Sequence, residues 1–561
     1  MQRHGRRHRC QTGAMPDADD AMRWGRPAHP VELNPAMRQF LAERVGVALP
    51  WPARPPEEWV LPASALSAQV VADLRRAVGD DHVRVDRESR LGALGGASYL
   101  DYARRRGGDV DDAPDAVVRP ASHDEVLGVL RVCADHGVAV VPLGGGTSVV
   151  GGLRARHPHI ALTLDRLGSL MDLDTTSGIA TVGPATTGPL LEALLAARGF
   201  TLGHLPQSWQ RATIGGYVAT RSAGQASTGY GRSDDMVESL RVATPEGTLD
   251  LGRGPSTAAG PDLRGLVIGS EGAFGVITRV SLRVRRLPSA RRYEGLLFPD
   301  FATGCEAFRL AAQSRATADV MRLSDETETA TTMLMSGPSG LTAAALQRYL
   351  RARGVDWDRA ALAIVGWEGT DADLVKARRA ATLRALRSHG AVSLGARVGA
   401  SWQSNRFHGP FLRDALLDAG YLVETVETGT TWRELAALHG GVHAALESAL
   451  GPVAQASSLG DGPYVMSHVS HVYETGASLY TTVLAVADQS DPVDQWNHAK
   501  RAVTDEIMSQ GATLTHHHAV GRDHAPWLAD EVGPLGVRAV RAVKGAWDPS
   551  GVMNPGAVIE E

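Results

Sequence analysis

The sequence predicts an α+β fold in two parts: a glycine-rich domain that binds a large ligand, followed by a domain with an antiparallel sheet. Three observations predict it. Glycine turns recur after apolar strands as far as Pro288, strands and helices alternate from Tyr293 to about Val486, and 561 residues suffice for two to four domains with large cores. The stretch PLGGGTSVVGGL at 142–153 is the turn around which the other elements are arranged.

Composition excludes several function classes. The net charge is -5 and no basic stripe alternates with aromatic residues, so we expect no nucleic-acid partner. Cys10, Cys133 and Cys305 lie far apart and lack metal-ligand spacing, which predicts neither a disulfide framework nor a metal site. No apolar run reaches about 18 residues and no secretory pattern begins the chain, so we expect a cytoplasmic protein. Abundant arginine, alanine and glycine indicate a GC-rich bacterial gene.

The first elements lead to the glycine turn. We expect an N-terminal extension over 1–94, disordered in about its first 30 residues, with one helix near 66–78. The glycine-rich domain then spans 95–289. It begins with a strand at 116–119 and a helix from Ser122 to Gly137, where Glu125 has the spacing of a capping box. The next strand ends at Leu143, so the turn lies at a strand's carboxyl end, where α/β sheets bind ligands.

Residues 144–148, GGGTS, have the composition of a phosphate-binding turn. Successive backbone N–H groups form an anion-binding concavity, and glycine leaves space for a pyrophosphate to approach. Two further glycine-rich stretches follow, at 204–232 and at 266–285. The first of them has few large apolar residues, so we expect a bound partner to order it.

The second domain spans 290–490, with strands near 296–301, 319–324 and 361–369 and helices near 305–314, 343–351 and 371–390. Two of its stretches, 401–431 and 467–483, mix charged residues and histidines with apolar ones. A C-terminal helical segment, 491–561, is expected to complete the active site. It contains LTHHHAVGR at 514–522 after an expected apolar strand, and DPSGVMNPG at 548–556.

Three kinds of side chain in these stretches suit acid–base chemistry or anion binding. The histidines 516–518 titrate near neutral pH and can supply a general base. A tyrosine beside a cation, such as Tyr480, is easier to ionise, and the planar fork of Arg413 suits phosphate or carboxylate. Each also has a structural interpretation: a metal site or surface run for the histidines, a core position for Tyr480, and an ion pair with a nearby aspartate for Arg413.

The order GGGTS, ATIGGYVATRSAG, GSEGAFGVIT and a terminal DPSGVMNPG resembles flavoproteins of the vanillyl-alcohol oxidase or PCMH type. Within them the chain is most similar to the alkyldihydroxyacetonephosphate synthase branch, through VYETGASLY, LTHHHAVG and FLRDALLDAGYLVETVETGTTW. The resemblance implies a two-part PCMH-type FAD-binding domain, an α+β cap domain and noncovalent FAD, because no histidine stands in the first glycine turn. The implied cofactor residues are Pro142, Leu143, Gly144, Gly145, Gly146, Thr147, Ser148, Gln207, Ser208, Thr213, Gly215, Gly216, Thr220, Arg221, Ser222, Ala223, Glu271, Gly272, Ala273, Phe274, Gly275, Val276 and Ile277.

The resemblance also implies an activity. It assigns proton transfer to Tyr480, catalytic roles to His516, His517 and His518, and substrate phosphate to Arg413. The implied reaction is a redox-neutral exchange of the acyl group of acyl-dihydroxyacetone phosphate for a long-chain fatty alcohol, which makes an ether lipid precursor. The implied partners are these lipid substrates, a peripheral membrane contact and a second copy of the chain in a homodimer.

Two alternatives stay open. The first is an FAD-dependent dehydrogenase or oxidase of a 2-hydroxy acid, of the D-lactate or glycolate type. Relatives of that type hold a divalent metal through histidines and a glutamate, where this sequence has Tyr480 and His517, which disfavours metal-dependent chemistry. The second is a flavin-binding scaffold without catalysis, which the presence of both Tyr480 and the histidine triplet disfavours.

Overall fold

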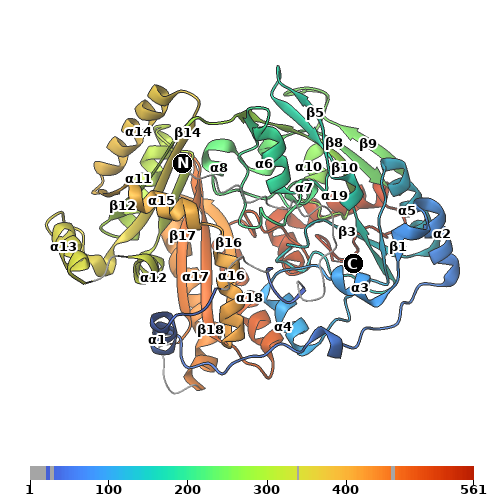
Figure 1. The fold of residues 1–561 in the computed structure, drawn as a ribbon, viewed down its shortest axis with the longest axis horizontal. Helices are drawn as coiled ribbons and strands as arrows, with labels where there is room; N and C mark the ends of the chain where they lie inside the picture. Colours follow the sequence, from blue (N-terminus) through green and yellow to red (C-terminus); the bar gives the residue numbers. More distant parts are fainter. Residues whose placement is uncertain (1–20, 26–30, 338–339, 457–461, 561) are drawn as a thin grey trace, which may run out of the picture.

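The computed structural model describes residues 21–25, 31–337, 340–456 and 462–560. Cys10 and most of the first 30 residues, which we expected to be disordered, lie outside this part. Figure 1 shows the sheets of the first unit on the right and the long strands of the second on the left. The helices that precede Ala116 are α1 (Pro35–Arg44), η2 (Pro56–Glu58), α2 (Ala68–Val78), η3 (Asp80–His82), α3 (Arg87–Gly92) and α4 (Tyr99–Gly107).

A four-stranded sheet in the order β1-β2-β4-β3 carries the first glycine turn. Strands β2 and β3 both run parallel to β4, which lies between them. Helix α5 connects β2 to β3, and the turn follows β3 directly. The elements are β1 (Val83–Arg84), β2 (Ala116–Val118), α5 (His123–His136), β3 (Ala139–Leu143), β4 (His159–Thr163) and η4 (Asp165–Leu167).

The start of α5 differs from the expected capping box in one contact. The Ser122 hydroxyl accepts from the backbone N–H of Glu125 at 3.1 Å, as expected. The Glu125 carboxylate, however, accepts from the N–H of Ala121 at 2.7 Å, one residue before the cap. Both N–H groups at the helix entrance still gain an acceptor, so the local stabilisation is kept.

A second, five-stranded sheet in the order β5-β6-β10-β8-β9 is wholly antiparallel. The second glycine-rich stretch, residues 204–232, forms short helices beside this sheet. The elements are β5 (Leu170–Asp174), β6 (Ile179–Val182), α6 (Gly188–Ala196), β7 (Phe200–Thr201), α7 (Ile214–Ala219), α8 (Ser227–Tyr230), α9 (Ser233–Met236), β8 (Val237–Thr244), β9 (Gly247–Leu251), α10 (Arg264–Val267), β10 (Val276–Arg283) and β11 (Arg285–Arg286), which pairs with β7.

The cap unit is a seven-stranded antiparallel sheet in the order β15-β12-β14-β13-β17-β18-β16. Together with the two sheets of the first unit, it confirms the α+β class with a two-part ligand-binding domain and a cap. Its strands are β12 (Ala290–Phe298), β13 (Val320–Ser324), β14 (Ala361–Gly369), β15 (Val392–Gly395), β16 (Tyr421–Thr431), β17 (Tyr464–Val472) and β18 (Gly476–Val486).

The two faces of this sheet have different roles. Successive side chains of a strand point to opposite faces, so Leu479 packs in the large core beneath the helices while Tyr480 faces the other way. Helices α11, α14 and α17 supply much of that core. The remaining elements are α11 (Phe301–Gln313), α12 (Glu326–Ser336), α13 (Gly340–Arg351), η5 (Trp357–Arg359), α14 (Ala372–Arg387), α15 (Ala396–Asn405), α16 (Gly409–Asp418), α17 (Leu435–Ala456), α18 (Pro492–Ser509), η6 (Ala525–Trp527) and α19 (Leu528–Trp547).

The last residues return to the first sheet. The backbone N–H of Val140 in β3 donates to the carbonyl of Val552 at 2.8 Å, and the N–H of Asn554 donates back to Val140 at 2.9 Å. The motif at 548–556 thus extends the four-stranded sheet beside the strand that precedes the glycine turn. The buried amide of Asn554 also donates to the carbonyls of Gly152 and Glu271, which ties the first and third glycine turns together.

Candidate active site

One cavity of about 550 Å³ lies between the glycine turns and the cap sheet. Its volume is within the range of ordinary cofactor and ligand sites. Most of the predicted cofactor residues line it, namely 142–148, Gln207, Ser208, Thr213, Gly215, Gly216, Thr220, Ser222, Ala223, Glu271, Gly272 and 275–277. The predicted residues Arg413, Tyr480, His517 and His518 line it as well.

The first glycine turn forms a cradle within this cavity. No backbone N–H of residues 144–149 donates a hydrogen bond to another described residue, and the buried Ser148 hydroxyl has no partner. A Cβ on Gly145 would overlap the carbonyl of Arg211, and one on Gly144 would lie 2.6 Å from Thr213 Oγ1. Unpartnered N–H groups in a turn that excludes side chains suit a pyrophosphate, so the turn fits FAD.

Three predicted cofactor residues do not line the cavity. The Arg221 guanidinium donates to the carbonyls of Ile268 and Gly265 at 2.9 and 3.0 Å, which directs it away from the cavity. Ala273 and Phe274 are buried in an apolar cluster with Leu528 and residues near the C-terminus. The middle of the third glycine turn, Ala273 and Phe274, therefore packs against the C-terminal segment.

Glu271 lines the cavity but its carboxylate also has a structural partner. It accepts from the backbone N–H groups of Val520 and Gly521 at 3.1 and 2.6 Å, just after the histidine triplet. Burial raises the pKa of Glu271 to about 7, although these two hydrogen bonds act in the opposite direction. Glu271 thus links the third glycine turn to the loop that carries the histidines.

Three neighbouring strands bring a row of polar side chains to the cavity. Tyr480 on β18 is paired with Glu427 on β16 and with His468 on β17. The ring of Tyr480 stacks on His468 at 5.0 Å and on His517 at 5.9 Å between centroids. Burial raises the pKa of Tyr480 to about 12, so the expectation of an easily ionised phenol is wrong because desolvation outweighs the charge of Arg413.

Glu427 orders the histidine triplet, and we did not predict it. Its carboxylate accepts from the backbone N–H groups of His516, His517 and His518 at 2.8, 3.0 and 2.8 Å, and from the Thr515 hydroxyl at 2.5 Å. Burial alone would raise its pKa, but the imidazole of His517, whose Nδ1 lies 3.2 Å from Oε2, and the imidazoles of His518 and His516 hold it well below the usual range. The triplet follows a loop after α18, so the apolar strand expected before it is absent.

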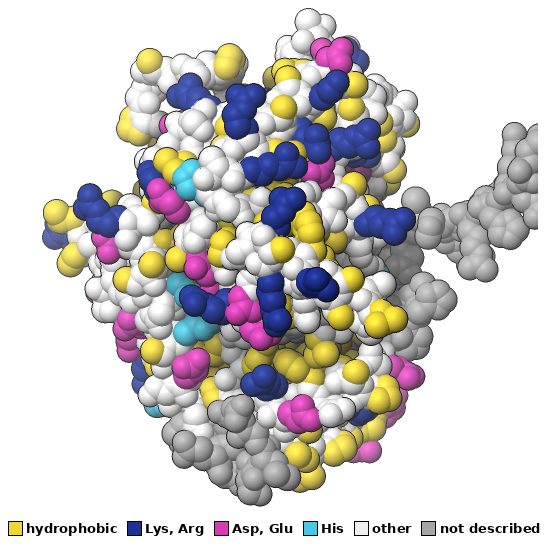
Figure 2. Space-filling model, turned by 90° about the vertical axis from the view of Figure 1, so that its left-hand side faces the viewer, with side chains coloured by type: hydrophobic (Ala, Val, Ile, Leu, Met, Phe, Trp, Pro, Cys, Tyr) yellow, Lys and Arg dark blue, Asp and Glu magenta, His cyan; other side chains and the backbone are white. Residues whose placement is uncertain are grey.

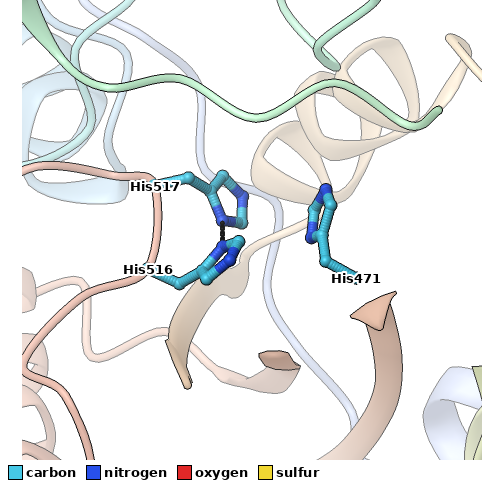
Figure 3. A group of neighbouring side chains, drawn as sticks. All are labelled: His471, His516 and His517. Carbon is cyan, nitrogen blue, oxygen red and sulfur yellow. Dashed lines mark hydrogen bonds between the residues drawn. The ribbon is translucent and has the colours of Figure 1, made fainter. Parts of the chain in front are cut away.

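His516 lies behind His517 and does not line the cavity. His471, His516 and His517 each bring a ring nitrogen within 4.8 Å of the others (Figure 3), which is close enough for a metal ion. Both nitrogens of His471 and of His516 already make hydrogen bonds within the protein, so the cluster is held together without one. Two further groups have metal-compatible spacing, Asp115 with His157 and His159, and Asp325 with His439 and His443.

Two arginines of the cavity keep unused donors. Nε and Nη2 of Arg413, and Nε and Nη1 of Arg406, are buried without a hydrogen-bond partner among the described residues. Arg413 is held by a hydrogen bond from Nη1 to the carbonyl of Ala97 at 2.7 Å and lies over the ring of Tyr102. Arg406 lies over the rings of Trp402 and Phe407. We did not predict Arg406, whose only sequence signal was its place among apolar residues seven positions before Arg413.

Comparison with known proteins agrees with this architecture. Residues 114–251 match the family described as "FAD binding domain", and residues 287–558 match "FAD linked oxidases, C-terminal domain". The chain is 32% identical over 524 residues to the alkyldihydroxyacetonephosphate synthase of Trypanosoma brucei brucei, covering 91% of this chain and 84% of that protein. It is 31% identical over 499 residues to the synthase of Dictyostelium discoideum, covering 88% and 80%.

A solved structure of an alkyldihydroxyacetonephosphate synthase has a similar fold. The fold superposes on that of an alkyldihydroxyacetonephosphate synthase with a TM-score of 0.78, at 28% sequence identity, over 93% of this chain and 92% of that one. The similarity therefore extends through both units and includes the histidine loop and the cap sheet.

Proposed function

The chain belongs to the alkyldihydroxyacetonephosphate synthase family of FAD-linked oxidases, and on that premise we propose that it exchanges the acyl group of acyl-dihydroxyacetone phosphate for a long-chain alcohol. FAD is its cofactor. The product would be alkyl-dihydroxyacetone phosphate, a precursor of ether lipids. The observation that carries this proposal is the pair of unsatisfied guanidinium groups in the cavity that Tyr480 and His517 also line.

Arg406 and Arg413 support a substrate with a phosphate group. A buried charged donor without an acceptor costs free energy, roughly 1–3 kcal/mol for each unmade hydrogen bond, and a bound anion removes that cost. Both guanidinium groups line the same cavity, where their two positive charges and four unpartnered nitrogens favour an anion with more than one negative charge. A phosphate monoester, with three terminal oxygens and up to two negative charges, is the better complement.

The residues around the glycine turn support noncovalent FAD. The free N–H groups of residues 144–149 would hold the pyrophosphate, and Thr147 and Ser148 would add hydroxyl donors. No histidine stands in that turn to form a covalent link. Denaturation should therefore release the yellow chromophore into the supernatant, and colour that stays with the precipitated protein would contradict this part of the proposal.

Each reacting group has a role that follows from its surroundings. When bound, FAD would supply an electron-accepting flavin ring. Tyr480 keeps its proton at neutral pH and can donate a hydrogen bond or a proton to the substrate. His517 offers the cavity an Nε2 atom that makes no hydrogen bond to a described residue, so it can accept the proton of the incoming alcohol.

The alternative of 2-hydroxy acid oxidation is less well supported. The metal-binding positions expected for that chemistry hold Tyr480 and His517, whose rings stack on one another. A hydroxy acid carries a single negative charge, which complements the two guanidinium groups of Arg406 and Arg413 less well than a phosphate monoester does. The same experiment tests both functions.

An apolar hollow on the surface of the cap unit supports lipid substrates. The face of the cap unit in Figure 2 is hollowed below its centre, where mostly hydrophobic side chains are in view with Lys or Arg at the edge. Within the described residues, no helix combines the length and hydropathy that a membrane crossing needs. We propose peripheral contact of a cytoplasmic protein with the membrane.

Homodimer formation is a further part of the proposal, and sedimentation of the purified protein would test it.

The test of the function is an anaerobic mixture of the yellow protein with palmitoyl-dihydroxyacetone phosphate and a fatty alcohol. Release of free fatty acid and formation of the alkyl product without any electron acceptor would support the exchange reaction. Arg406→Gln and Arg413→Gln should each raise the KM for the acyl phosphate. Bleaching of the flavin by D-lactate or glycolate, with recovery only on adding an electron acceptor, would overturn the proposal in favour of a dehydrogenase.

A further inference from the structure

His516 connects the cavity residue His517 to Tyr473 through hydrogen bonds on both of its ring nitrogens. Its Nδ1 lies 3.0 Å from Nδ1 of His517, the contact drawn in Figure 3, and its Nε2 lies 2.6 Å from the Tyr473 hydroxyl. A neutral imidazole can accept a proton at one nitrogen and release another from its second nitrogen. His516 is therefore placed to pass protons between its two neighbours.

Tyr473 lies at the edge of the molecule, in the hairpin between β17 and β18. It is 38% exposed, whereas His516 is 8% exposed. The charged groups nearest the tyrosine hydroxyl are Arg232, Asp234 and Asp235, and Asp235 is exposed. The three rings thus form a continuous path from the cavity to a polar patch at the surface.

Other contacts fix the geometry of this path. Arg232 Nη1 donates to the carbonyl of His516 at 3.0 Å, and Glu427 accepts from the backbone N–H groups of the triplet. Oε2 of Glu427 also lies 3.2 Å from Nδ1 of His517, so this carboxylate holds the imidazole in place. His516 also stacks on His471 at 4.9 Å between centroids. Burial, with the nearby His517, lowers the pKa of His516 to about 3, so the ring is neutral at working pH and can act as both acceptor and donor.

We propose that His517, His516 and Tyr473 form a proton relay that carries the proton of the incoming alcohol from the cavity to solvent. The inference rests on the proposed function, which requires such a path. An ester plus an alcohol gives an ether, a carboxylate and one proton, because the released fatty acid is ionised at neutral pH. One proton must therefore leave the buried site in each turnover.

The transfers balance along the three rings. The alcohol proton goes to Nε2 of His517, and the proton on its Nδ1 crosses to Nδ1 of His516. The proton on Nε2 of His516 passes to the Tyr473 oxygen, whose own proton goes to water or to the carboxylates of Asp234 and Asp235. No electrons move, and no group beyond the substrate and solvent is needed.

The experiment compares Tyr473→Phe with the wild-type protein, and uses Tyr349→Phe, at an exposed tyrosine of α13, as the matched control. The relay predicts a fall in kcat of about tenfold to a hundredfold in Tyr473→Phe with little change in KM. Added imidazole should restore part of the rate, because a small base can replace the missing hydroxyl. FAD content and the midpoint of thermal unfolding should stay near the wild-type values. Wild-type kcat in Tyr473→Phe, or a loss that imidazole does not rescue, would overturn the relay.

A second measurement keeps this test separate from the identity of the substrate. In NMR spectra of protein with ¹⁵N-labelled histidine, the relay predicts a proton shared between Nδ1 of His516 and Nδ1 of His517. It also predicts that the ¹⁵N chemical shift of Nε2 of His516 changes in Tyr473→Phe. An unchanged Nε2 shift would overturn the relay without turnover data. A wild-type protein inactive on acyl-dihydroxyacetone phosphate would contradict the proposed function instead.

Discussion

At the residue scale, Tyr480 shows how packing sets the chemistry of a side chain. The sequence places a cation near it, and Arg413 does contribute a favourable charge, but burial dominates and raises the pKa of the phenol to about 12. The phenol therefore enters a reaction as a proton donor, or ionises only when substrate and cofactor change its surroundings. Its stacking between His468 and His517 restrains the ring in one orientation.

Tyr480→Phe should lower turnover by about a hundredfold or more while FAD stays bound, because the ring and its packing remain and only the hydroxyl is lost. The measurement is the steady-state exchange rate together with the flavin absorbance per protein. Tyr464→Phe is the matched control, since the Tyr464 hydroxyl bonds Thr331 and the carbonyl of Thr327 outside the cavity. Full activity of Tyr480→Phe would show that the phenol takes no part in proton transfer.

At the element scale, β16 organises the catalytic loop through one carboxylate. Glu427 satisfies three consecutive backbone N–H groups of the triplet, which has no regular secondary structure of its own. Sequence reasoning could not identify this residue, because the contact joins positions about 90 apart and depends on how the C-terminal segment returns to the sheet. The only signal was the presence of two acidic residues, Glu424 and Glu427, in a strand of otherwise apolar and hydroxyl side chains.

Glu427→Gln should reduce stability by about 1–3 kcal/mol and activity by a larger factor. The amide can still accept at one oxygen, but its NH₂ group would then face a backbone N–H of the triplet. Both groups are hydrogen-bond donors, so that N–H would lose its acceptor. Thermal unfolding and the exchange rate measure the two effects. Glu434→Gln, at an exposed position beyond the end of β16, serves as control and should match the wild type.

The first glycine turn makes a second prediction at this scale. Gly145→Val should yield folded protein without flavin, because the new side chain would overlap the Arg211 carbonyl and displace the turn that faces the pyrophosphate. Flavin absorbance after gel filtration measures the loss. Gly440→Ala, where an added Cβ meets no atom within 4 Å, is the control and should retain FAD. A fully yellow Gly145→Val protein would contradict the placement of the cofactor.

At the scale of the whole molecule, the sequence was sufficient for the architecture and for part of the site. Glycine turns and alternating strands are local patterns, so the two-part domain and the antiparallel cap could be predicted, and Tyr480 and His517 followed from a resemblance. Arg406 and Tyr473 could not, since their significance depends on which side chains remain unpartnered or bonded in three dimensions. The outward direction of Arg221 was hidden for the same reason.

The buried histidines predict how the whole molecule responds to acid. Burial lowers their pKa values, so between about pH 6.5 and the lowered value the unfolded chain binds protons that the folded chain does not, and stability falls as the pH falls. Each such proton is worth about 1.4 kcal/mol per pH unit in that window. The pKa is lowered to about 4 for His159, and to about 3 for His204, His443, His516, His518 and His524.

Carboxyls whose pKa is raised by burial oppose this trend, and among the described residues these are Asp112, Glu192, Glu271, Asp325, Asp414, Glu424 and Asp523. Burial raises the pKa of Glu271 to about 7 and that of Asp414 to about 6, so these groups bind protons in the folded state first and stabilise it on acidification. The pKa values of His123, His468 and His471 are lowered as well, so nine described histidines outnumber the seven carboxyls, and the midpoint of thermal unfolding should fall when the pH is lowered from about 7 to about 5. His524→Asn should reduce the slope, whereas the same change at the exposed His498 should not. A midpoint that stays level or rises over this range would mean that the histidines are protonated in the folded protein, which would also remove the neutral ring that the relay needs at His516.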